Sequence, residues 1–462
     1  MRKSVVSNLG FVLQTAGILM ILPIVVSFYY QEKDSLISLL LTSFSFLSLG
    51  FLMNSLAERK ELDFKSSCLL VTLTFFVAAL IGSIPYLYLN IFNSESILQN
   101  VIDSYFESIS GYTTTGFSLI KNLENLPKSI ILYRSLTQWI GGIGIVYLIL
   151  AFFYSEEILN NLLEAIGFKK TLSRIKNSML EVIIIYSFYT LLYFVLFYYL
   201  GLRDFVTNIS IVFSGLSTGG FSPIKELSLL DNRALVLIIL IMITGGTSFY
   251  IHHSIVFRKF KNLKSEELLT FLLIVFLSSL FFFKCSGLDY FASLFHVTSA
   301  ATATGFSFLD LRALQQPLKV FLIMLMFIGG SSFSTSGGIK VYRLLVFFRS
   351  IGYVIRKKLG YEDKCLIEGR EISDNEIILH LLNVILSFIL VFIFAFLLSF
   401  YGHDFVDSIF ECVSAFSNVG LSAGIVNIDL SLIEKTFLIL LMGIGRVEAI
   451  IFLIAIIKIN NK

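Results

Sequence analysis

The sequence predicts an all-α membrane protein, and three observations support this prediction. Of its 462 residues, 56% are hydrophobic and 15% are charged, and the mean hydropathy is +0.85, which lies outside the range of soluble globular proteins. Ten apolar stretches are long enough to cross a bilayer. A short glycine-containing motif also recurs four times. We therefore expect two N-terminal transmembrane helices followed by four repeated helical units in lipid.

The ten expected spans are separated in places by shorter apolar segments. A stretch of this shorter kind has the length of a re-entrant helix and cannot cross. The first span lacks a small-residue cleavage site, so we interpret it as a membrane helix and not as a signal peptide. The expected spans lie near 11–30, 35–54, 68–90, 129–154, 179–201, 233–257, 267–287, 317–348, 376–401 and 433–458, and the short segments near 101–112, 204–216, 289–301 and 405–416.

Basic residues indicate the orientation of the chain. Lys and Arg are about twice as frequent on one set of alternate loops as on the other, as the positive-inside rule requires. This pattern predicts a multi-pass membrane protein with both termini in the cytoplasm. The formal net charge of +3 gives no reason to expect a nucleic-acid partner.

The recurring motif defines the repeats. A single Gly-Phe-Ser sequence is typical of an ordinary helix C-cap. Four ungapped copies, each followed about 24 residues later by a second glycine landmark, instead indicate a repeated unit of helix, short helix, glycine loop and helix. The motifs are Ser110–Ser118, Ser214–Ser222, Ser299–Ser307 and Ser414–Ser422, and the second landmarks begin at Gly141, Gly245, Gly329 and Gly443.

These loops predict a cation filter. Non-helical backbone at membrane depth is tolerated only where protein buries it or water reaches it, and four such loops can converge on a pseudo-fourfold axis. Rings of carbonyl oxygens replace the hydration shell of K⁺, and the negative C-terminal ends of the short helices favour a cation. The predicted filter residues are Thr113, Thr114, Thr115, Gly116, Ser217, Thr218, Gly219, Gly220, Thr302, Ala303, Thr304, Gly305, Ser417, Asn418, Val419 and Gly420.

The predicted organisation follows from the motif positions. Two transmembrane helices occupy 1–66, and four pore repeats occupy 67–178, 179–265, 266–374 and 375–462.

Five segments form a specific set of motifs: Glu107–Gly116, Leu126–Arg134, Gln138–Ile145, Ile328–Lys340 and Gly443–Glu448. They resemble the Trk/Ktr potassium-uptake family, and within it the TrkH-type membrane subunit. The resemblance runs from about residue 10 to 458, and the two spans before the first repeat favour the TrkH branch over the KtrB branch.

The resemblance has implications for activity and partners. It implies a non-enzymatic K⁺-conducting subunit that forms a homodimer with one pore per protomer and is gated by a TrkA-like cytoplasmic NAD/ATP-binding regulatory subunit. It implies bound K⁺, no organic cofactor and a location in the bacterial cytoplasmic (inner) membrane. Glycine at the selectivity position of the first repeat, Gly116, favours K⁺ over Na⁺. Ala303 and Val419 depart from the family pattern, because they replace hydroxyl residues.

The segment from Gly329 to Gly338 contains four glycines and five Ser or Thr residues, so a continuous helix is not expected there. We interpret it as a mobile intramembrane gating loop beneath the filter. The alternative is a kink or close helix packing through small residues. The predicted gate residues are Gly329, Gly330, Ser334, Thr335, Gly337, Gly338, Lys340 and Arg446.

Arg446 lies midway through the last expected span, where a charge costs about 2.5 to 3.5 kcal/mol on insertion scales. We expect it to face the pore below the filter and to contact the gating loop; the alternative is snorkelling to the interface. Glu448 lies on a different helix face, so pairing between the two within one helix is not expected.

Other ionisable residues leave their roles open. Arg134 and Lys340 are expected to make interfacial or inter-repeat contacts. Glu107 and Glu411 occupy equivalent positions, three residues before the Ser of their motifs, and either buttress the filter or draw cations to its mouth.

Two other functional classes fit the sequence less well. An alternating-access symporter would need inverted repeats, whereas these repeats keep one orientation. A membrane enzyme would need clustered ionisable residues in the spans, and the sequence shows no such cluster. A Na⁺- or H⁺-coupled K⁺ symporter of the same superfamily remains the alternative to a channel-like uptake subunit.

Overall fold

The computed structural model describes residues 2–56, 62–94, 96–144, 175–257, 264–361 and 364–457. Helices dominate this part of the chain, and the one described sheet is the short antiparallel hairpin of β1 (Leu366–Ile367) and β2 (Arg370–Glu371). The predicted all-α architecture is confirmed. The predicted unit boundaries at 66, 178, 265 and 374 stay predictions.

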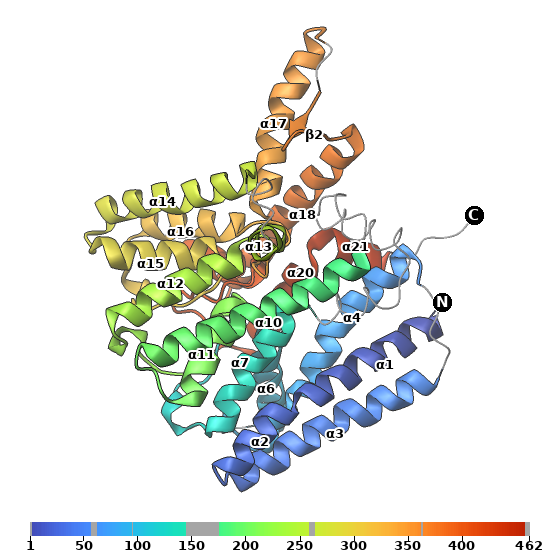
Figure 1. The fold of residues 1–462 in the computed structure, drawn as a ribbon, viewed down its shortest axis with the longest axis vertical. Coiled ribbons are helices and arrows are strands. Elements are labelled where there is room, and N and C mark those ends of the chain that lie inside the picture. Colours follow the sequence, from blue (N-terminus) through green and yellow to red (C-terminus); the bar gives the residue numbers. More distant parts are fainter. Residues whose placement is uncertain are drawn as a thin grey trace.

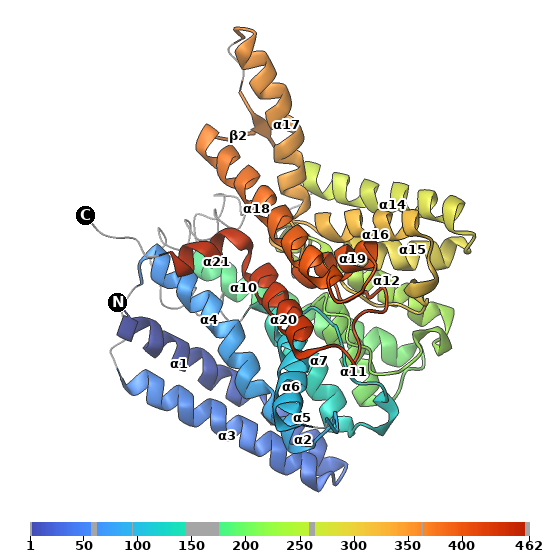
Figure 2. The same ribbon diagram turned by 180° about the vertical axis from the view of Figure 1, so that it is seen from behind.

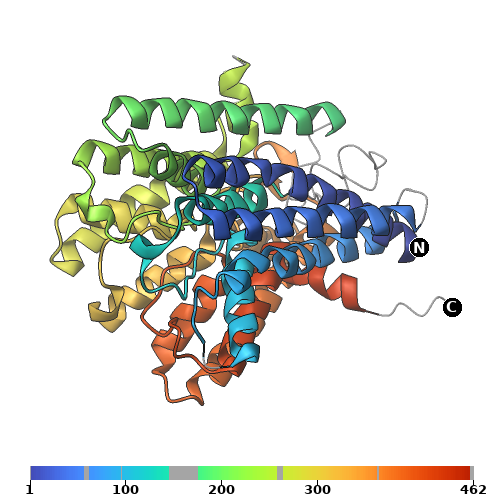
Figure 3. The same cartoon turned by 90° about the horizontal axis from the view of Figure 1, so that it is seen from below.

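Two long N-terminal helices run side by side along one flank (Figures 1 and 3). Glycines at their crossing let the two backbones approach closely, as small residues do between membrane helices. A Cβ on Gly10 would lie 2.5 Å from the Gly50 carbonyl oxygen, and a Cβ on Gly50 would lie 2.6 Å from that of Gly10. The N-terminal elements are α1 (Arg2–Leu19), α2 (Ile21–Tyr29) and α3 (Lys33–Ser55).

Four units follow, each with a long helix, a short helix, a loop and a further helix (Figure 2). The first comprises α4 (Phe64–Gly82), α5 (Ile84–Tyr88), α6 (Ile97–Tyr112), η1 (Leu123–Asn125) and α7 (Lys128–Ile143). The second comprises α10 (Ile175–Tyr199), α11 (Phe205–Leu216), η2 (Leu227–Leu229), α12 (Asn232–Gly246) and α13 (Phe249–Val256). The third comprises α14 (Glu266–Ser286), α15 (Tyr290–Ala301), η4 (Leu311–Ala313), α16 (Gln316–Ile328) and α17 (Val341–Lys358). The fourth comprises α18 (Asp374–Ser399), α19 (Phe405–Phe416), α20 (Leu432–Val447) and α21 (Ala449–Ile456).

The four short helices α6, α11, α15 and α19 begin in the same way. In each, the N-cap side chain accepts a hydrogen bond from a backbone N–H of the first turn, which satisfies one of the donors that a helix start leaves unpaired. These N-caps are Ser96, Asp204, Asp289 and Asp404.

Among the described residues, six helical segments are long and apolar enough to cross a membrane, or up to eight if each bent pair counts as one span. The spans predicted as single stretches near 233–257 and 433–458 are bent by 106° and 100°. At the second bend Glu448 has a φ of 74°, which an α-helix does not allow. The span predicted near 317–348 is interrupted by the loop between α16 and α17. Of the span predicted near 129–154, residues 145–154 lie outside the described residues.

Helix α17 projects from the helical body, and the β1–β2 hairpin lies between it and α18 (Figures 1 and 2). Its last turn carries Arg356, Lys357 and Lys358. The projection is therefore a basic extension beyond the bundle of apolar helices.

Candidate functional site

The loops after the four short helices share one backbone conformation. The first residue after each helix has a φ near −80°, the second has a φ between 51° and 56°, and the fourth, a glycine, has a φ between 76° and 89°. The φ of the glycine at the fourth position lies in the left-handed region, which favours glycine. The second-position residues are Thr114, Thr218, Ala303 and Asn418, and the glycines are Gly116, Gly220, Gly305 and Gly420.

The four loops form a closed ring. Each glycine approaches the carbonyl oxygen of the third loop residue in the next repeat so closely that a Cβ would collide with it. The contacts follow the chain order and close on the first repeat, so the loops surround one axis. They join Gly116 to the Gly219 oxygen, Gly220 to the Thr304 oxygen, Gly305 to the Val419 oxygen and Gly420 to the Thr115 oxygen.

Equivalent hydrogen bonds hold the loops. In every repeat the N–H of the third loop residue donates to the carbonyl of the Ser that opens the motif. The donor–acceptor distances are 2.9 Å for Thr115 and Ser110, 2.7 Å for Gly219 and Ser214, 2.9 Å for Thr304 and Ser299, and 2.9 Å for Val419 and Ser414.

Hydroxyl groups reinforce the loops of the first and third repeats. The hydroxyls of Thr113 and Thr115 lie 2.8 Å apart, and those of Thr302 and Thr304 lie 2.7 Å apart. Ser417 of the fourth repeat is buried in the same position as Thr113 and Thr302. All sixteen predicted filter residues therefore lie in the ring.

Two cavities lie near the loops. One of about 490 Å³ opens onto Gly305 and Gly420 of the ring and is also lined by Asp310, Arg312 and Asp429. The hydrogen bonds from Arg312 lower the pKa of Asp310. The approach to the ring thus carries charged side chains of both signs.

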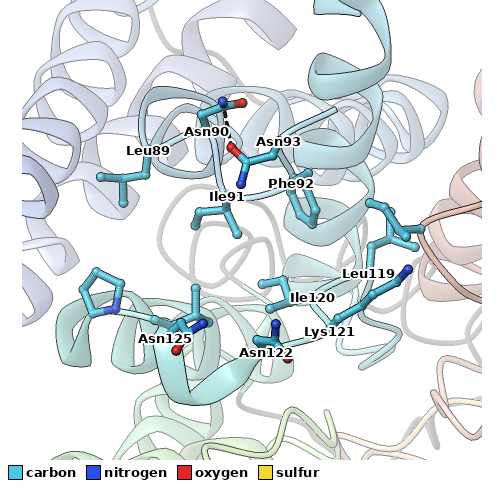
Figure 4. Close-up of a pocket in the computed structure, with 13 residues that line it drawn as sticks. Leu89, Asn90, Ile91, Phe92, Asn93, Leu119, Ile120, Lys121, Asn122 and Asn125 are labelled. Atoms are coloured by element: carbon cyan, nitrogen blue, oxygen red, sulfur yellow. Dashed lines mark hydrogen bonds between the residues drawn. The ribbon is translucent and has the colours of Figure 1, made fainter. Parts of the chain in front are cut away.

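The other cavity, of about 510 Å³, is lined by several asparagines and no ring residue (Figure 4). The Asn90 amide donates to Asn93 Oδ1 at 3.1 Å, so part of this polar lining is already satisfied. The ring, and not this cavity, is the candidate site.

A buried carboxylate braces the first loop. Glu107 is fully buried and accepts hydrogen bonds from the Leu119 N–H at 3.0 Å and from Ser118 Oγ at 2.9 Å. Arg134 Nη2 lies 2.7 Å from Glu107 Oε1, and the Arg134 guanidinium lies 4.1 Å from the centre of the Phe221 ring in the second repeat. Of the two roles expected for Glu107, these contacts fit the buttress. The interfacial position expected for Arg134 is wrong, because its side chain is 2% exposed; the inter-repeat contact is present.

The equivalent positions in the other repeats differ. Glu411 Oε1 accepts from Ser422 Oγ at 2.6 Å and from the Ile425 N–H at 3.1 Å, again within its own loop. His296 of the third repeat accepts from the Phe308 N–H at 3.2 Å through Nε2. The second repeat has the apolar Ile211 at this position.

Removing Arg134 is expected to destabilise the protein strongly. Arg134→Met leaves the Glu107 charge buried without its cation, which costs about 3 to 5 kcal/mol of unfolding free energy. Thermal unfolding of the purified protein in detergent measures the loss. Lys121→Met is the matched control, because the Lys121–Asp429 pair is exposed and such pairs contribute about 0 to 1 kcal/mol. Equal melting temperatures for the two variants would contradict the bracing role.

The predicted gating segment is a compact non-helical loop between α16 and α17. Gly329 and Gly338 have φ values of 70° and 77°, and a Cβ on Gly338 would lie 2.8 Å from the Gly329 Cα, so the two ends of the loop are in contact. Gly330 N–H donates to Ser336 Oγ at 3.0 Å, and Ser334 Oγ donates to the Ser331 carbonyl at 2.5 Å. Residues 329–340 are not helical, which contradicts the alternative of a kinked helix.

The loop packs against the ends of two short helices. Thr335 Oγ1 lies 2.9 Å from the Leu216 carbonyl oxygen at the end of α11 and 3.4 Å from Thr218 Oγ1 of the ring. A Cβ on Gly337 would collide with the Ser417 carbonyl oxygen, the first residue after α19. The Lys340 ammonium donates to the Ser336 carbonyl, so its contact lies inside the loop and not at an interface.

Arg446 joins this loop to the first repeat. Its Nη1 donates to the Thr335 carbonyl at 2.9 Å, and its Nη2 donates to the Gly141 and Gly142 carbonyls at 2.6 and 3.2 Å. Arg446 therefore contacts the loop, as expected. Its position midway along a straight span is wrong, because α20 ends one residue later and the chain then bends.

Glu448, at that bend, pairs with Arg343 of α17 and not with Arg446. Asn383 of α18 donates to the same carboxylate at 3.2 Å. The base of the projecting helix is thus tied to the break between α20 and α21.

The sequence model of the TrkH family, described as a cation transport protein, matches residues 39–286 and 263–462. The chain belongs to the TrkH family. A curated relative in Methanocaldococcus jannaschii, described as an uncharacterized cation transporter, is 32% identical in an alignment of 465 positions that covers 97% of this chain and 94% of the relative. The Trk system potassium uptake protein TrkH of Escherichia coli is 26% identical in an alignment of 470 positions that covers 94% of each chain.

A solved structure shares the fold of this TrkH-family chain. The crystal structure of the potassium transporter TrkH from Vibrio parahaemolyticus superimposes with a TM-score of 0.87 over 99% of both chains, at 24% identity. The family assignment and the apolar helices together describe a multi-pass membrane protein whose relatives are transporters.

Two residues that support the ring in this TrkH-family chain were missed from the sequence. His296 stands in register with Glu107 and Glu411, so the repeat alignment itself was a signal for it. Gln138 of α7 accepts from the Phe221 N–H at 3.1 Å and donates to the Gly219 carbonyl at 2.5 Å. Nothing in the spacing of the motifs indicates that contact, because it crosses from one repeat to the next.

Proposed function

We propose that this chain takes up K⁺ across the cytoplasmic membrane through the ring of four loops. The observation that carries the proposal is the closed order of contacts between each ring glycine and a carbonyl oxygen of the next repeat. Carbonyl oxygens brought together in this way can replace the water that a monovalent cation sheds.

The partial charges of the surrounding backbone favour the binding of a cation in the ring. The C-terminal ends of α6, α11, α15 and α19 all meet the ring, and helix C-termini carry partial negative charge. Glycine occupies the selectivity position of all four repeats, which favours K⁺ over Na⁺ in the family that the sequence resembles. The Escherichia coli relative is described as a potassium uptake protein, and the Vibrio parahaemolyticus relative as a potassium transporter.

Gating is proposed for the loop between α16 and α17. It contacts residues at the ends of α11 and α19, and Arg446 bonds it to the first repeat. A loop in this position obstructs the passage below the ring when it is closed, and movement of Thr335 and Gly337 away from the axis opens it.

The proposed assembly is a homodimer with one pore per protomer and a cytoplasmic NAD/ATP-binding regulatory subunit of the TrkA type. The basic end of α17 supports a cytoplasmic location for that projection, because positive charge gathers on the inner side of membranes. In this proposal, the Arg343–Glu448 pair transmits a movement of α17 to the gating loop.

Growth on limiting K⁺ tests the function. Expression of the chain with its regulatory subunit in a bacterial strain that lacks K⁺ uptake is expected to restore growth at low K⁺ and to increase cell K⁺. No rescue by membrane-inserted protein, with purified protein equally inactive in liposomes, would contradict the proposal.

Ion coupling is the second candidate and needs its own test. All four short helices direct their C-termini to the ring, whereas alternating-access carriers are built from inverted repeats. In proteoliposomes, a K⁺ gradient alone is expected to drive flux. Flux that requires a Na⁺ or H⁺ gradient would favour the coupled symporter.

A further inference from the structure

The second repeat builds its part of the ring differently from the other three. Gly219 stands where the other repeats have Thr115, Thr304 and Val419. Its carbonyl oxygen is the member of the ring that approaches Gly116. The second loop therefore offers the ring a carbonyl without the side chain that stiffens its counterparts.

A side chain from the first repeat fills the empty space. A Cβ on Gly219 would lie 2.6 Å from Gln138 Oε1 and 2.9 Å from Gln138 Cβ, so Gln138 occupies the volume that a side chain at 219 would take. Gln138 lies three residues before the glycine Gly141 and is fully buried. Gln138 lies eleven residues after Pro127, the N-cap of α7, and the residues at the same distance from the N-caps of α12, α16 and α20 are Met242, Met326 and Met442.

The orientation of the Gln138 amide is dictated by its two neighbours. The Phe221 N–H can only donate, and it lies 3.1 Å from Gln138 Oε1. The Gly219 carbonyl can only accept, and it lies 2.5 Å from Gln138 Nε2. The two hydrogen bonds span Gly220 and hold its loop from both sides.

The Gly219 carbonyl thus differs from its three partners in the ring. Within the described residues, the carbonyl oxygens of Thr115, Thr304 and Val419 accept no hydrogen bond, whereas that of Gly219 accepts one from Gln138. An oxygen that already accepts an N–H attracts a cation less strongly and is less free to move toward a small ion. Both effects disfavour Na⁺, which needs a stronger field and a tighter ring than K⁺.

We propose that Gln138 is a specificity-determining positioning residue, which holds the Gly219 carbonyl and weakens its field so that the ring discriminates against Na⁺. This inference rests on the proposed function of the ring. Gln138 acts through Gly219 and does not itself bind the ion.

The test measures Rb⁺, as a probe for K⁺, and Na⁺ fluxes into proteoliposomes that contain the full chain. Gln138→Met gives the first repeat the residue of the other three and removes the donor. The Rb⁺/Na⁺ flux ratio is expected to fall about fivefold, the factor that corresponds to one hydrogen bond of about 1 kcal/mol, mainly through greater Na⁺ flux. Met326→Leu, a volume-conserving change at an equivalent position, is expected to leave the ratio unchanged.

A second variant separates packing from the hydrogen bond. Gln138→Gly with Gly219→Ala empties the volume that Gln138 fills and gives the loop a methyl group, but it supplies no donor to the Gly219 carbonyl, so the ratio is expected to stay low. An unchanged ratio in a folded Gln138→Met protein, or an unchanged ratio in the folded double variant, would overturn the role of Gln138. Failure of both variants to fold would also overturn it, because Gln138 would then act on stability alone. Absence of Rb⁺ flux in the unchanged protein would instead contradict the proposed function.

Discussion

Gly305→Ala is expected to abolish K⁺ uptake while leaving the protein able to insert and fold. The Cβ of the new side chain would collide with the Val419 carbonyl oxygen, which is backbone and belongs to the ring itself. The φ of 89° at Gly305 adds a strain of about 1 to 2 kcal/mol for a residue with a Cβ. The ring must widen or shift one of its four carbonyls, so Rb⁺ flux into proteoliposomes is expected to fall to the background of empty vesicles.

Gly402→Ala is the matched control. Its φ of 90° imposes the same backbone strain, but a Cβ there has no neighbour within 4 Å. The control is therefore expected to conduct normally with a small loss of stability. Normal Rb⁺ flux through Gly305→Ala would contradict a tight ring at that position, whereas equal loss in both variants would assign the effect to strain alone.

Arg446→Gln is expected to raise K⁺ flux severalfold, most clearly when the regulatory subunit is absent. The guanidinium donates to the Thr335 carbonyl of the proposed gating loop and to two carbonyls at the end of α7, and it places a positive charge near the proposed path of the ion. Hydrogen bonds to a charged group are worth about 1.5 to 3 kcal/mol, so their loss releases the loop and lowers the barrier to cations.

The measurement is the initial rate of Rb⁺ uptake into proteoliposomes at matched protein density. Arg349→Gln serves as the control. Arg349 of the projecting helix α17 forms an exposed pair with Glu266 of α14, so this variant is expected to change the rate little. A rate for Arg446→Gln at or below that of the unchanged protein, with a normal melting temperature, would contradict the gating role.

The repeat alignment predicted the ring residues, because four ungapped motifs on equivalent short helices must present equivalent backbone. Glycine was the informative residue, since the positive φ at Gly116 and its three counterparts is a local requirement that the sequence records directly. The order in which the loops contact one another was not predictable, because it depends on how four separate units pack.

Contacts between units explain why the remaining features could not be predicted from the sequence. Gln138 acts on the second repeat from the first, and Arg134 reaches Phe221 across the same boundary, so neither role is visible in a pattern within one repeat. The bends of α12–α13 and α20–α21 were missed because hydropathy is continuous through them. The glycine landmarks lie next to both bends, but the contacts of Glu448 with Arg343 and Asn383 come from other helices and leave no signal in the local sequence.

Anomalous diffraction from crystals grown with Tl⁺ or Rb⁺ tests the central claim most directly. We predict a peak on the axis between the carbonyl oxygens of Thr115, Gly219, Thr304 and Val419, at a distance from each that suits direct coordination. Ordered ion density elsewhere in the molecule, with none on that axis in a ring whose loops are well ordered, would contradict the account.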